Sequence, residues 1–430
     1  MALKKTPVNG MKDIEPEEMD VRMYVESVII DTYTSYGFIP IETPCMEDIR
    51  NLMSKQGGEN EKLIFKVLKR GEKLKLDQAE TENDLVDYGM RYDLTVPLCR
   101  YYANHSADLP TPFKALQIGN VWRADRPQRG RYRQFKQCDI DIIGDGTALA
   151  EIDLILATTE VLGRIGFADF EIRINERRIL KAMADYCGFP DEGFDSLCIT
   201  LDKMDKIGMD GVAAELQKEG FAKESIDSYI TLLDGIGLAE DGFAWLMEQL
   251  GDLLPADVID RMAEIFEAVG ETKKTNFELV FDPTLVRGMS YYTGTIFEIA
   301  MPDLGISCGG GGRYDKMVGQ FTGHDVPACG FSIGFERIIM LLMESGFHIP
   351  TEHVKLAYLM ERDLSVTLLT EVIESAQKAR ENGDEVYLTY MNKNKKFQKE
   401  QLEKAGYEIV EFYNTLDQRQ VKGDLPWQNR

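Results

Sequence analysis

Hydrophobic residues recur along the chain with two periods, at every second position in some segments and at every third or fourth in others. The first period is typical of strands and the second of amphipathic helices. Strands are predicted at 38–44, 169–175, 276–282, 290–300 and 328–334, and helices at 16–36, 147–165 and 335–344. The buried face of the first helix is predicted to consist of Met19, Met23, Val28, Ile29, Thr32 and Tyr36. Together these segments indicate an α+β main domain.

Two regions differ from this mixed pattern. Residues 176–275 are rich in helix-forming residues with amphipathic spacing, which indicates a helical insertion within a main domain of residues 1–350. After a proline-containing linker, residues 354–430 are expected to form a small C-terminal α/β domain. Its strands are predicted at 355–361, 385–391 and 407–413, and its helices at 365–382 and 394–405.

The most informative segment is a hairpin predicted at residues 114–143. Apolar and polar residues alternate on both sides of a turn that contains Pro127 and Gly130. The second strand presents Phe135, Gln137, Asp139 and Asp141 on one face, and Cys138, Ile140 and Ile142 on the other. We expect the apolar face to be buried and the polar face to present an amide and carboxylates to an active site.

The same hairpin carries five arginines within eleven positions, namely Arg123, Arg126, Arg129, Arg131 and Arg133. Arginine suits planar, bidentate contact with phosphate. The cluster also opposes the charge of the whole chain, which is −24. The alternative is a solvated hairpin tip with surface salt bridges. The near absence of lysine favours an anion site.

Composition limits the remaining possibilities. The 430 residues are 44% hydrophobic, which is ordinary for a folded protein, and the negative charge argues against general nucleic-acid binding. No apolar run approaches the length of a membrane span, and the N-terminus has no secretory signal pattern. Seven scattered cysteines without a CxxC pair fit a reducing cytoplasm. Four separated histidines form no ligand pair, so no protein-held metal is predicted.

Other motifs carry candidate chemistry. Arg287 stands beside a glycine and ahead of Tyr291 and Tyr292, a combination that suits an anionic ligand with polar groups. Arg337 lies at the start of a predicted helix, where it can reach a phosphate. The glycine run Gly309–Gly312 either admits a flat ligand such as adenine or forms a flexible loop. Neither a P-loop nor a dinucleotide-binding glycine motif is present.

Taken together, these segments resemble the histidyl-tRNA synthetase family of class II aminoacyl-tRNA synthetases, nearly continuously over residues 5–345. The matching segments are 37–48 (motif 1), 91–97, 121–144 (motif 2), 285–298, 309–315 and 330–341 (motif 3). The resemblance implies an antiparallel-sheet catalytic domain with a helical insertion, followed by an anticodon-binding-like domain. It also implies a homodimeric, cytoplasmic enzyme that uses ATP with Mg²⁺ to join histidine to tRNA(His).

The resemblance assigns roles to matching positions. For histidine binding it implies Asp93, Leu94, Thr95, Gln137, Asp141, Tyr291, Tyr292 and Tyr314. For ATP binding it implies Arg123, Arg131 and Arg337, of which Arg123 contacts the α-phosphate. Arg123 and Arg287 are the implied catalytic residues, and Arg287 offsets charge while the histidine carboxylate attacks.

The chain departs from the family pattern at a few points, so two alternative functions remain beside that of a histidine–tRNA ligase. Ser290 stands where Asp or Asn is usual, and Asp125 replaces a common glutamate. The C-terminal domain is shortened, which leaves anticodon recognition open. One alternative is the non-catalytic, synthetase-like regulatory subunit of ATP phosphoribosyltransferase, which often lacks the catalytic arginines. The other alternative is a paralogue that activates histidine without charging tRNA.

Overall fold

The computed structural model describes residues 3–53, 60–287, 291–301, 305–350 and 353–414. The chain divides into two compact units. The larger unit consists of Met1–Asp13 and Arg22–Glu344, and the smaller unit consists of Ile14–Val21 and Ser345–Arg430. Within the described ranges, no helix has both the length and the apolar character needed to cross a membrane.

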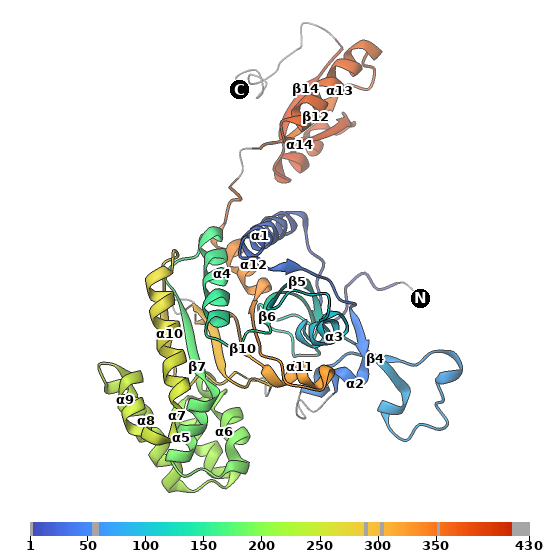
Figure 1. The fold of residues 1–430 in the computed structure, drawn as a ribbon. Coiled ribbons are helices and arrows are strands. Elements are labelled where there is room, and N and C mark those ends of the chain that lie inside the picture. Colours follow the sequence, from blue (N-terminus) through green and yellow to red (C-terminus); the bar gives the residue numbers. More distant parts are fainter. Residues whose placement is uncertain (1–2, 54–59, 288–290, 302–304, 351–352, 415–430) are drawn as a thin grey trace. The chain divides into compact units, whose positions relative to one another are not determined.

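An eight-stranded sheet lies at the centre of the larger unit (Figure 1). In order across the sheet, its strands are β1 (Ile39–Pro40), β5 (Phe113–Trp122), β6 (Gln134–Ile143), β11 (Ala328–Ile333), β10 (Ile306–Arg313), β9 (Thr295–Met301), β7 (Phe170–Glu176) and β8 (Phe277–Phe281). The inner pairs are antiparallel, whereas the edge pairs β1–β5 and β7–β8 are parallel. The predicted α+β class is therefore confirmed.

Strands β5 and β6 form the predicted hairpin, and the structure buries both of its faces. On the apolar face, Lys136 forms an ion pair with Glu26 of α1 (Pro16–Ser35), which places that helix there. On the polar face, Asp139 and Asp141 are only 4% and 3% exposed. The expectation of a single buried face is wrong, because Tyr314 and helix α3 (Thr95–His105) lie against the polar row.

The predicted buried face of α1 is confirmed in the second half of the helix, where Val28, Ile29 and Thr32 are at most 7% exposed, and is wrong in the first half. Met19 and Met23 are 39% and 60% exposed, whereas Arg22 is 6% exposed. The Arg22 guanidinium donates to the Glu336 carboxylate of α12 (Phe335–Ser345), with Nη1 and Oε2 2.7 Å apart. A hydrophobic pattern counts arginine as an exposed residue, so it misplaces the buried face in the first turns of this helix.

The glycine run belongs to β10, a central strand, and its interpretation as a flexible loop is wrong. In the β10–β11 ladder, Gly311 pairs with Phe331 and Gly312 pairs with Gly330. A Cβ atom on Gly311 would lie 1.9 Å from the Gly330 carbonyl oxygen. Propensity does not predict this strand, because glycine is a weak strand former and occurs here for close backbone approach.

Helices occupy the predicted insertion. They are α5 (Arg177–Tyr186), α6 (Phe194–Leu201), α7 (Met204–Glu219), α8 (Lys223–Leu238), α9 (Gly242–Leu250) and α10 (Ala256–Thr272), and no strand interrupts the described residues between them. The remaining helices of the larger unit are α2 (Ile49–Leu52), α4 (Leu149–Ile165) and α11 (Asp315–Thr322). A small antiparallel sheet in the order β2–β4–β3 contains β2 (Met46–Asp48), β4 (Val86–Met90) and β3 (Lys66–Leu68).

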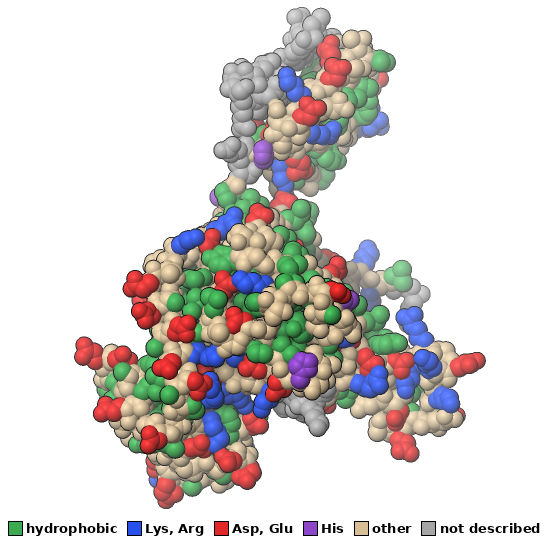
Figure 2. Space-filling view, in the orientation of Figure 1, with side chains coloured by type: hydrophobic (Ala, Val, Ile, Leu, Met, Phe, Trp, Pro, Cys, Tyr) green, Lys and Arg blue, Asp and Glu red, His purple; other side chains and the backbone are tan. Residues whose placement is uncertain are grey.

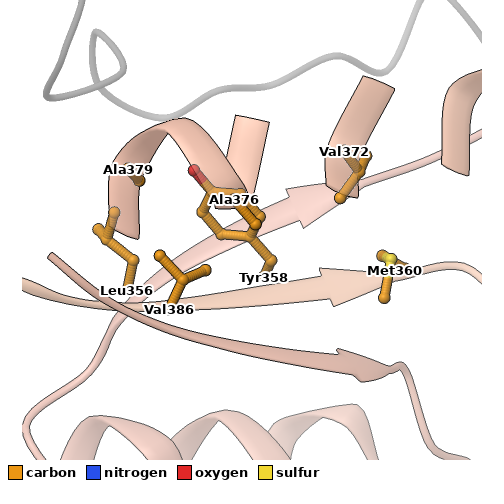
Figure 3. Close-up of a cluster of buried hydrophobic side chains, with 7 residues drawn as sticks. All are labelled: Leu356, Tyr358, Met360, Val372, Ala376, Ala379 and Val386. Atoms are coloured by element: carbon orange, nitrogen blue, oxygen red, sulfur yellow. The ribbon is translucent and has the colours of Figure 1, made fainter. Parts of the chain in front are cut away.

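The smaller unit is a parallel α/β fold. Its elements are β12 (Lys355–Met360), α13 (Val366–Glu381), β13 (Glu385–Tyr390), α14 (Lys395–Lys404) and β14 (Glu408–Phe412), with strand order β13–β12–β14. Tyr358 of β12 packs against Val372 and Ala376 of α13 in a buried cluster (Figure 3). The other face of β12 contributes Ala357 and Leu359 to a second cluster. Because both faces of β12 are buried, its sequence is a continuous apolar run.

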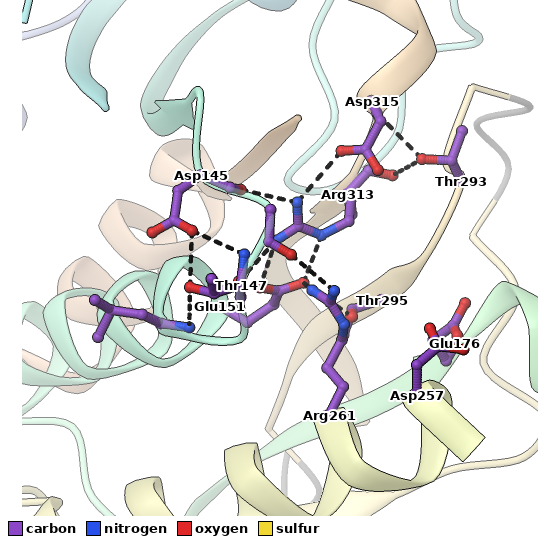
Figure 4. Close-up of polar contacts among 12 residues, drawn as sticks. Asp145, Thr147, Glu151, Glu176, Asp257, Arg261, Thr293, Thr295, Arg313 and Asp315 are labelled. Carbon is purple, nitrogen blue, oxygen red and sulfur yellow. Dashed lines mark hydrogen bonds and ion pairs between the residues drawn. The ribbon is translucent and has the colours of Figure 1, made fainter. Parts of the chain in front are cut away.

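A buried ion pair joins the centre of the sheet to α4. Glu151 is fully buried, and Arg313, at the end of β10, is 4% exposed. The Arg313 guanidinium donates to both Glu151 oxygens, with Nε–Oε1 and Nη2–Oε2 distances of 2.7 and 2.6 Å. Figure 4 shows that the network extends to Asp145, Thr147, Arg261, Thr295 and Asp315. The pair therefore connects the sheet, α4 and α10.

Replacing Glu151 with alanine is expected to lower the free energy of unfolding of the larger unit by about 3–5 kcal/mol, because Arg313 would stay buried with, among the described residues, only the 3.3 Å contact to Asp315 as counter-charge. Denaturant unfolding followed by circular dichroism measures this change. The matched control is Glu215→Ala, which removes a half-exposed ion pair with Lys203 and is expected to cost less than about 1 kcal/mol. Equal losses in the two variants would contradict the role of the buried pair.

Candidate functional site

The polar row of β6 ends at a buried carboxylate. The Tyr314 hydroxyl donates to Asp141 Oδ1 at 2.5 Å. Gly330 faces Asp141 across the ladder, and a Cβ atom there would lie 2.0 Å from the same oxygen. Burial raises the pKa of Asp141 to about 7, with Tyr314 acting in the opposite direction and the charge of Asp93 in the same one. The charge of this carboxyl at neutral pH therefore depends on what binds beside it.

The turn into α3 supplies a second buried carboxylate. Asp93 Oδ1 accepts the backbone N–H of Val96 at 3.1 Å and so caps the helix. Leu94 is 1% exposed, and its carbonyl accepts the Gln117 amide at 3.1 Å. Thr95 is the first residue of α3 and is buried. These bonds hold the turn beside the polar row of β6.

Tyrosines lie against the same site. The ring centroid of Tyr291 is 4.8 Å from that of Tyr292 and 6.1 Å from that of Tyr314. Burial raises the pKa of Tyr291 well above its usual range, and neighbouring Tyr292 and Asp93 act in the same direction. The phenol therefore stays protonated and can donate to a ligand. Ser290, in the same motif, lies outside the described residues.

Buried acceptors converge on this site. Asp93 Oδ2, Gln137 Oε1, Asp139 Oδ1 and Asp141 Oδ2 have no hydrogen-bond partner among the described residues. An unsatisfied buried acceptor costs roughly 1–3 kcal/mol, and more when it is charged. A ligand that carries positive charge and N–H donors would satisfy these atoms.

Arg123 is fixed between two aromatic rings at the end of the hairpin strands. Its guanidinium carbon lies 4.2 Å from the ring centroid of Tyr92 and 5.2 Å from that of Phe135. Its Nε atom donates to the Tyr92 carbonyl at 3.0 Å. The positive charge of Arg123 also favours the ionised form of Asp93. Cation–π stacking thus orients this arginine close to the carboxylates.

Three arginines, Arg131, Arg287 and Arg337, form a second cationic group. Burial lowers the pKa of Arg337, and the charges of Arg131 and Arg287 act in the same direction. Arg337 Nη1 donates to the Ser307 carbonyl, and Arg131 lies 3.8 Å from the Asp125 carboxylate. Like charges held close together in a partly buried place favour the binding of an anion.

Arg287 has a constrained geometry. Its φ angle is 50°, which is uncommon for a residue other than glycine. Its Nη1 atom donates to the Gly309 carbonyl at 3.0 Å and lies 3.3 Å from Glu298 Oε2. A cavity of about 160 Å³ adjoins Arg287 and is also lined by Arg173, Asp202, Asp282 and Glu298. The absence of a side chain at Gly310 leaves room for the guanidinium.

The structure uses the other hairpin arginines differently. Arg129 forms an exposed ion pair with Glu344, and Arg133 donates to the Asp125 carbonyl at 3.0 Å. Tyr92 and Glu298, which contact Arg123 and Arg287, have no role in the sequence prediction. Their sequence signal was weak, because neither belongs to a polar run and each acts through an arginine distant in sequence.

Comparison with known proteins places these features in a family context. A sequence model of the histidyl-tRNA synthetase family matches residues 10–338. The histidine–tRNA ligase of Leifsonia xyli subsp. xyli is 47% identical over 353 residues, which cover 80% of this chain and 81% of the relative.

Solved structures give a similar result. The chain is similar to the crystal structure of histidyl-tRNA synthetase from Nostoc sp. PCC 7120, with a TM-score of 0.74, 25% identity, and coverage of 95% of this chain and 92% of that one. It is also similar to a Bacillus halodurans C structure described as an ATP phosphoribosyltransferase regulatory subunit/histidyl-tRNA synthetase. That likeness, with a TM-score of 0.74, 22% identity, and coverage of 96% and 99%, shows the fold alone.

Gly310→Ala tests the packing around Arg287. The new Cβ atom would lie 1.8 Å from Arg287 Nη1 and 2.5 Å from the Phe297 carbonyl oxygen. Both the arginine and the strand must shift, so we expect a loss of about 1–3 kcal/mol of stability. Thermal unfolding checks this expectation against Gly270→Ala on α10. Among the described residues, a Cβ at Gly270 would meet no atom within 4 Å apart from its chain neighbours and its own helix backbone, and helix propensity predicts a gain of up to about 1 kcal/mol. Unchanged stability of Gly310→Ala would contradict the packing argument.

Proposed function

The chain belongs to the histidyl-tRNA synthetase family, and on that premise we propose that it is a histidine–tRNA ligase. It activates histidine with ATP and transfers the amino acid to tRNA(His). The observation that carries the proposal is the presence of two regions of complementary charge. Buried carboxylates and an amide with unsatisfied acceptors lie near Arg123, and a separate group of arginines includes Arg287. The first region suits a cationic amino acid, and the second suits phosphates.

We assign the histidine contacts by chemistry. The α-ammonium group is held by Asp93, Thr95 and Gln137, with Leu94 completing the turn. The imidazole ring is bound by Asp141 and Tyr292, with Tyr291 and Tyr314 beside them. A carboxylate acceptor suits imidazole, because a ring N–H removed from water needs an oriented partner. Support comes from the Oδ2 atom of Asp141, which has no hydrogen-bond partner among the described residues, while Tyr314 already holds the other oxygen.

We assign the ATP contacts to Arg123 at the α-phosphate and to Arg131 and Arg337 at the remaining phosphates. The described residues contain no cluster of three or more acidic, histidine or cysteine side chains that could hold a metal ion. We therefore place Mg²⁺ with the phosphates of ATP, where it supplies additional charge neutralisation.

In the first step, a carboxylate oxygen of histidine attacks the α-phosphorus, the bond to the β-phosphate oxygen breaks, and pyrophosphate leaves. Arg287 and Arg123 stabilise the negative charge that accumulates on the α-phosphate. In the second step, a terminal ribose hydroxyl of tRNA attacks the carbonyl carbon of the histidyl-adenylate and gives up its proton, the bond from that carbon to the phosphate oxygen breaks, and AMP leaves. The site contributes positioning and electrostatic stabilisation, without a covalent enzyme intermediate.

The non-catalytic alternative has weaker support. The chain keeps Arg123, Arg131, Arg287 and Arg337, and its relative at 47% identity is a ligase. We also propose, from the family, a homodimer with residues 37–48 at its contact and a cytoplasmic location.

Pyrophosphate exchange tests the catalytic proposal. The purified protein is expected to exchange labelled pyrophosphate into ATP only when histidine is present, and then to charge tRNA(His). Absence of exchange would contradict both catalytic interpretations. Exchange without charging would favour the paralogue that only activates histidine.

Arg287→Ala is expected to reduce the exchange rate by about a hundredfold or more, because the variant loses charge stabilisation at the α-phosphate. Histidine affinity, measured by calorimetry, is expected to stay within about threefold, since Arg287 acts on the transition state. The matched control is Arg129→Ala, which removes an exposed arginine of the hairpin that pairs with Glu344. Near-normal exchange by Arg287→Ala would show that its assigned role is wrong.

A further inference from the structure

Asp139 occupies the middle of the polar row of β6 and has no assigned role. It pairs in register with Gln117 of β5 and with Ser332 of β11, so it lies within the sheet rather than at an edge. It is 4% exposed, and its Oδ1 atom has no hydrogen-bond partner among the described residues. The Gln137 amide reaches its other oxygen at a long 3.4 Å. Together with Asp93 and Asp141, Asp139 is therefore a third buried carboxylate among the residues proposed to bind the amino acid, which we call the amino-acid pocket.

Arg91 and Arg123, whose charges act on Asp139, are engaged in other bonds. Arg91 donates to the carbonyls of Thr43 and Asn120 at 2.6 and 2.8 Å. Arg123 donates to the Tyr92 carbonyl. Among the described residues, these bonds of Arg91 and Arg123 go to backbone carbonyls and not to the Asp139 carboxylate. Within the described part of the chain, the charges of Arg91 and Arg123 act on Asp139 without an observed ion pair to its carboxylate.

Like charges surround the same group. Asp141 lies two residues along the strand, and Asp93 faces it from the start of α3. The tyrosines Tyr33 of α1 and Tyr292 also interact electrostatically with Asp139. Three carboxylates in one buried pocket cannot all ionise without a large cost, so at least one must hold a proton until positive charge arrives.

We propose that Asp139 is a specificity-determining residue that holds a proton while the amino-acid pocket is unliganded and releases it to solvent when a cationic amino acid binds. The inference rests on the proposed function, in which that ligand is histidine. No covalent bond of the ligand changes. The proton leaves the Asp139 carboxyl group, and the positive charge of the ligand's α-ammonium then compensates the negative charge of the carboxylate. A ligand without an ammonium group cannot drive this exchange, so the pocket discriminates against it.

The electrostatics of the site agree with this geometry. Burial raises the pKa of Asp139 well above its usual range, and the charges of Asp141 and Asp93 raise it further. A hydrogen bond from the Ser332 side chain and the charge of Arg123 oppose this shift. A bound cation lowers this pKa. Between the lower pKa of the complex and the higher pKa of the free protein, the complex carries fewer protons. Histidine affinity therefore rises with pH across this window and levels off above it.

Calorimetry in buffers of different ionisation enthalpy measures the protons released when histidine binds. The full-length wild type is expected to release about one proton more than Asp139→Asn near neutral pH, and its affinity should depend more steeply on pH. Titration of histidine itself is common to both proteins and cancels in this difference. Asp139→Ser serves as a second uncharged variant if the asparagine protein does not fold.

Asp384→Asn is the matched control. Asp384 is also buried, at 8% exposed, but its Oδ1 atom accepts the Val354 N–H within the smaller unit. This control is expected to release as many protons as the wild type. Equal proton release by the wild type and the Asp139 variants would overturn the inference, even if the variants lost stability. If histidine does not bind to the wild type at all, the proposed function fails instead.

Discussion

The buried ion pair between Arg313 and Glu151 is the constraint on which the candidate site depends. Arg313 ends β10, and the next residue, Tyr314, donates to Asp141. Because the guanidinium donates two hydrogen bonds to Glu151, a shift of the strand end would leave a buried charge with fewer partners. The position of Arg313 therefore determines the position of Tyr314, which in turn orients the Asp141 carboxylate.

Glycines on the same strands serve the site by leaving space. Gly330 makes room for Asp141, and Gly310 makes room for Arg287. Side chains that pack against those of neighbouring strands normally stabilise strand pairing, so a glycine-rich central strand is locally less stable. Large charged groups take up that space, and the long-range ion pair compensates for weak local propensity.

The acidic pocket shows the same balance between stability and function. Carboxylates at Asp93, Asp139 and Asp141 are each at most 4% exposed, and each has one oxygen without a partner in the described structure. Such an arrangement is unfavourable for folding unless protons or a cation neutralise it. Binding sites often retain local conflicts of this kind, because a ligand resolves them. The hydrophobic face of β6, covered by α1, contributes the packing that offsets the cost.

Local patterns were sufficient for most elements and for the family. The helix predicted at 335–344 is α12 at Phe335–Ser345, and the predicted hairpin is β5 and β6, because hydrophobic periodicity reports on neighbouring residues. Contacts between distant residues determined the rest. Arg22 is buried because Glu336, 314 positions away, neutralises it. Gly311 lies in a strand because Gly330 packs against its backbone. Burial of the polar row and the stacking of Arg123 likewise depend on the folded chain, since neither charge compensation nor close packing is encoded in a single segment.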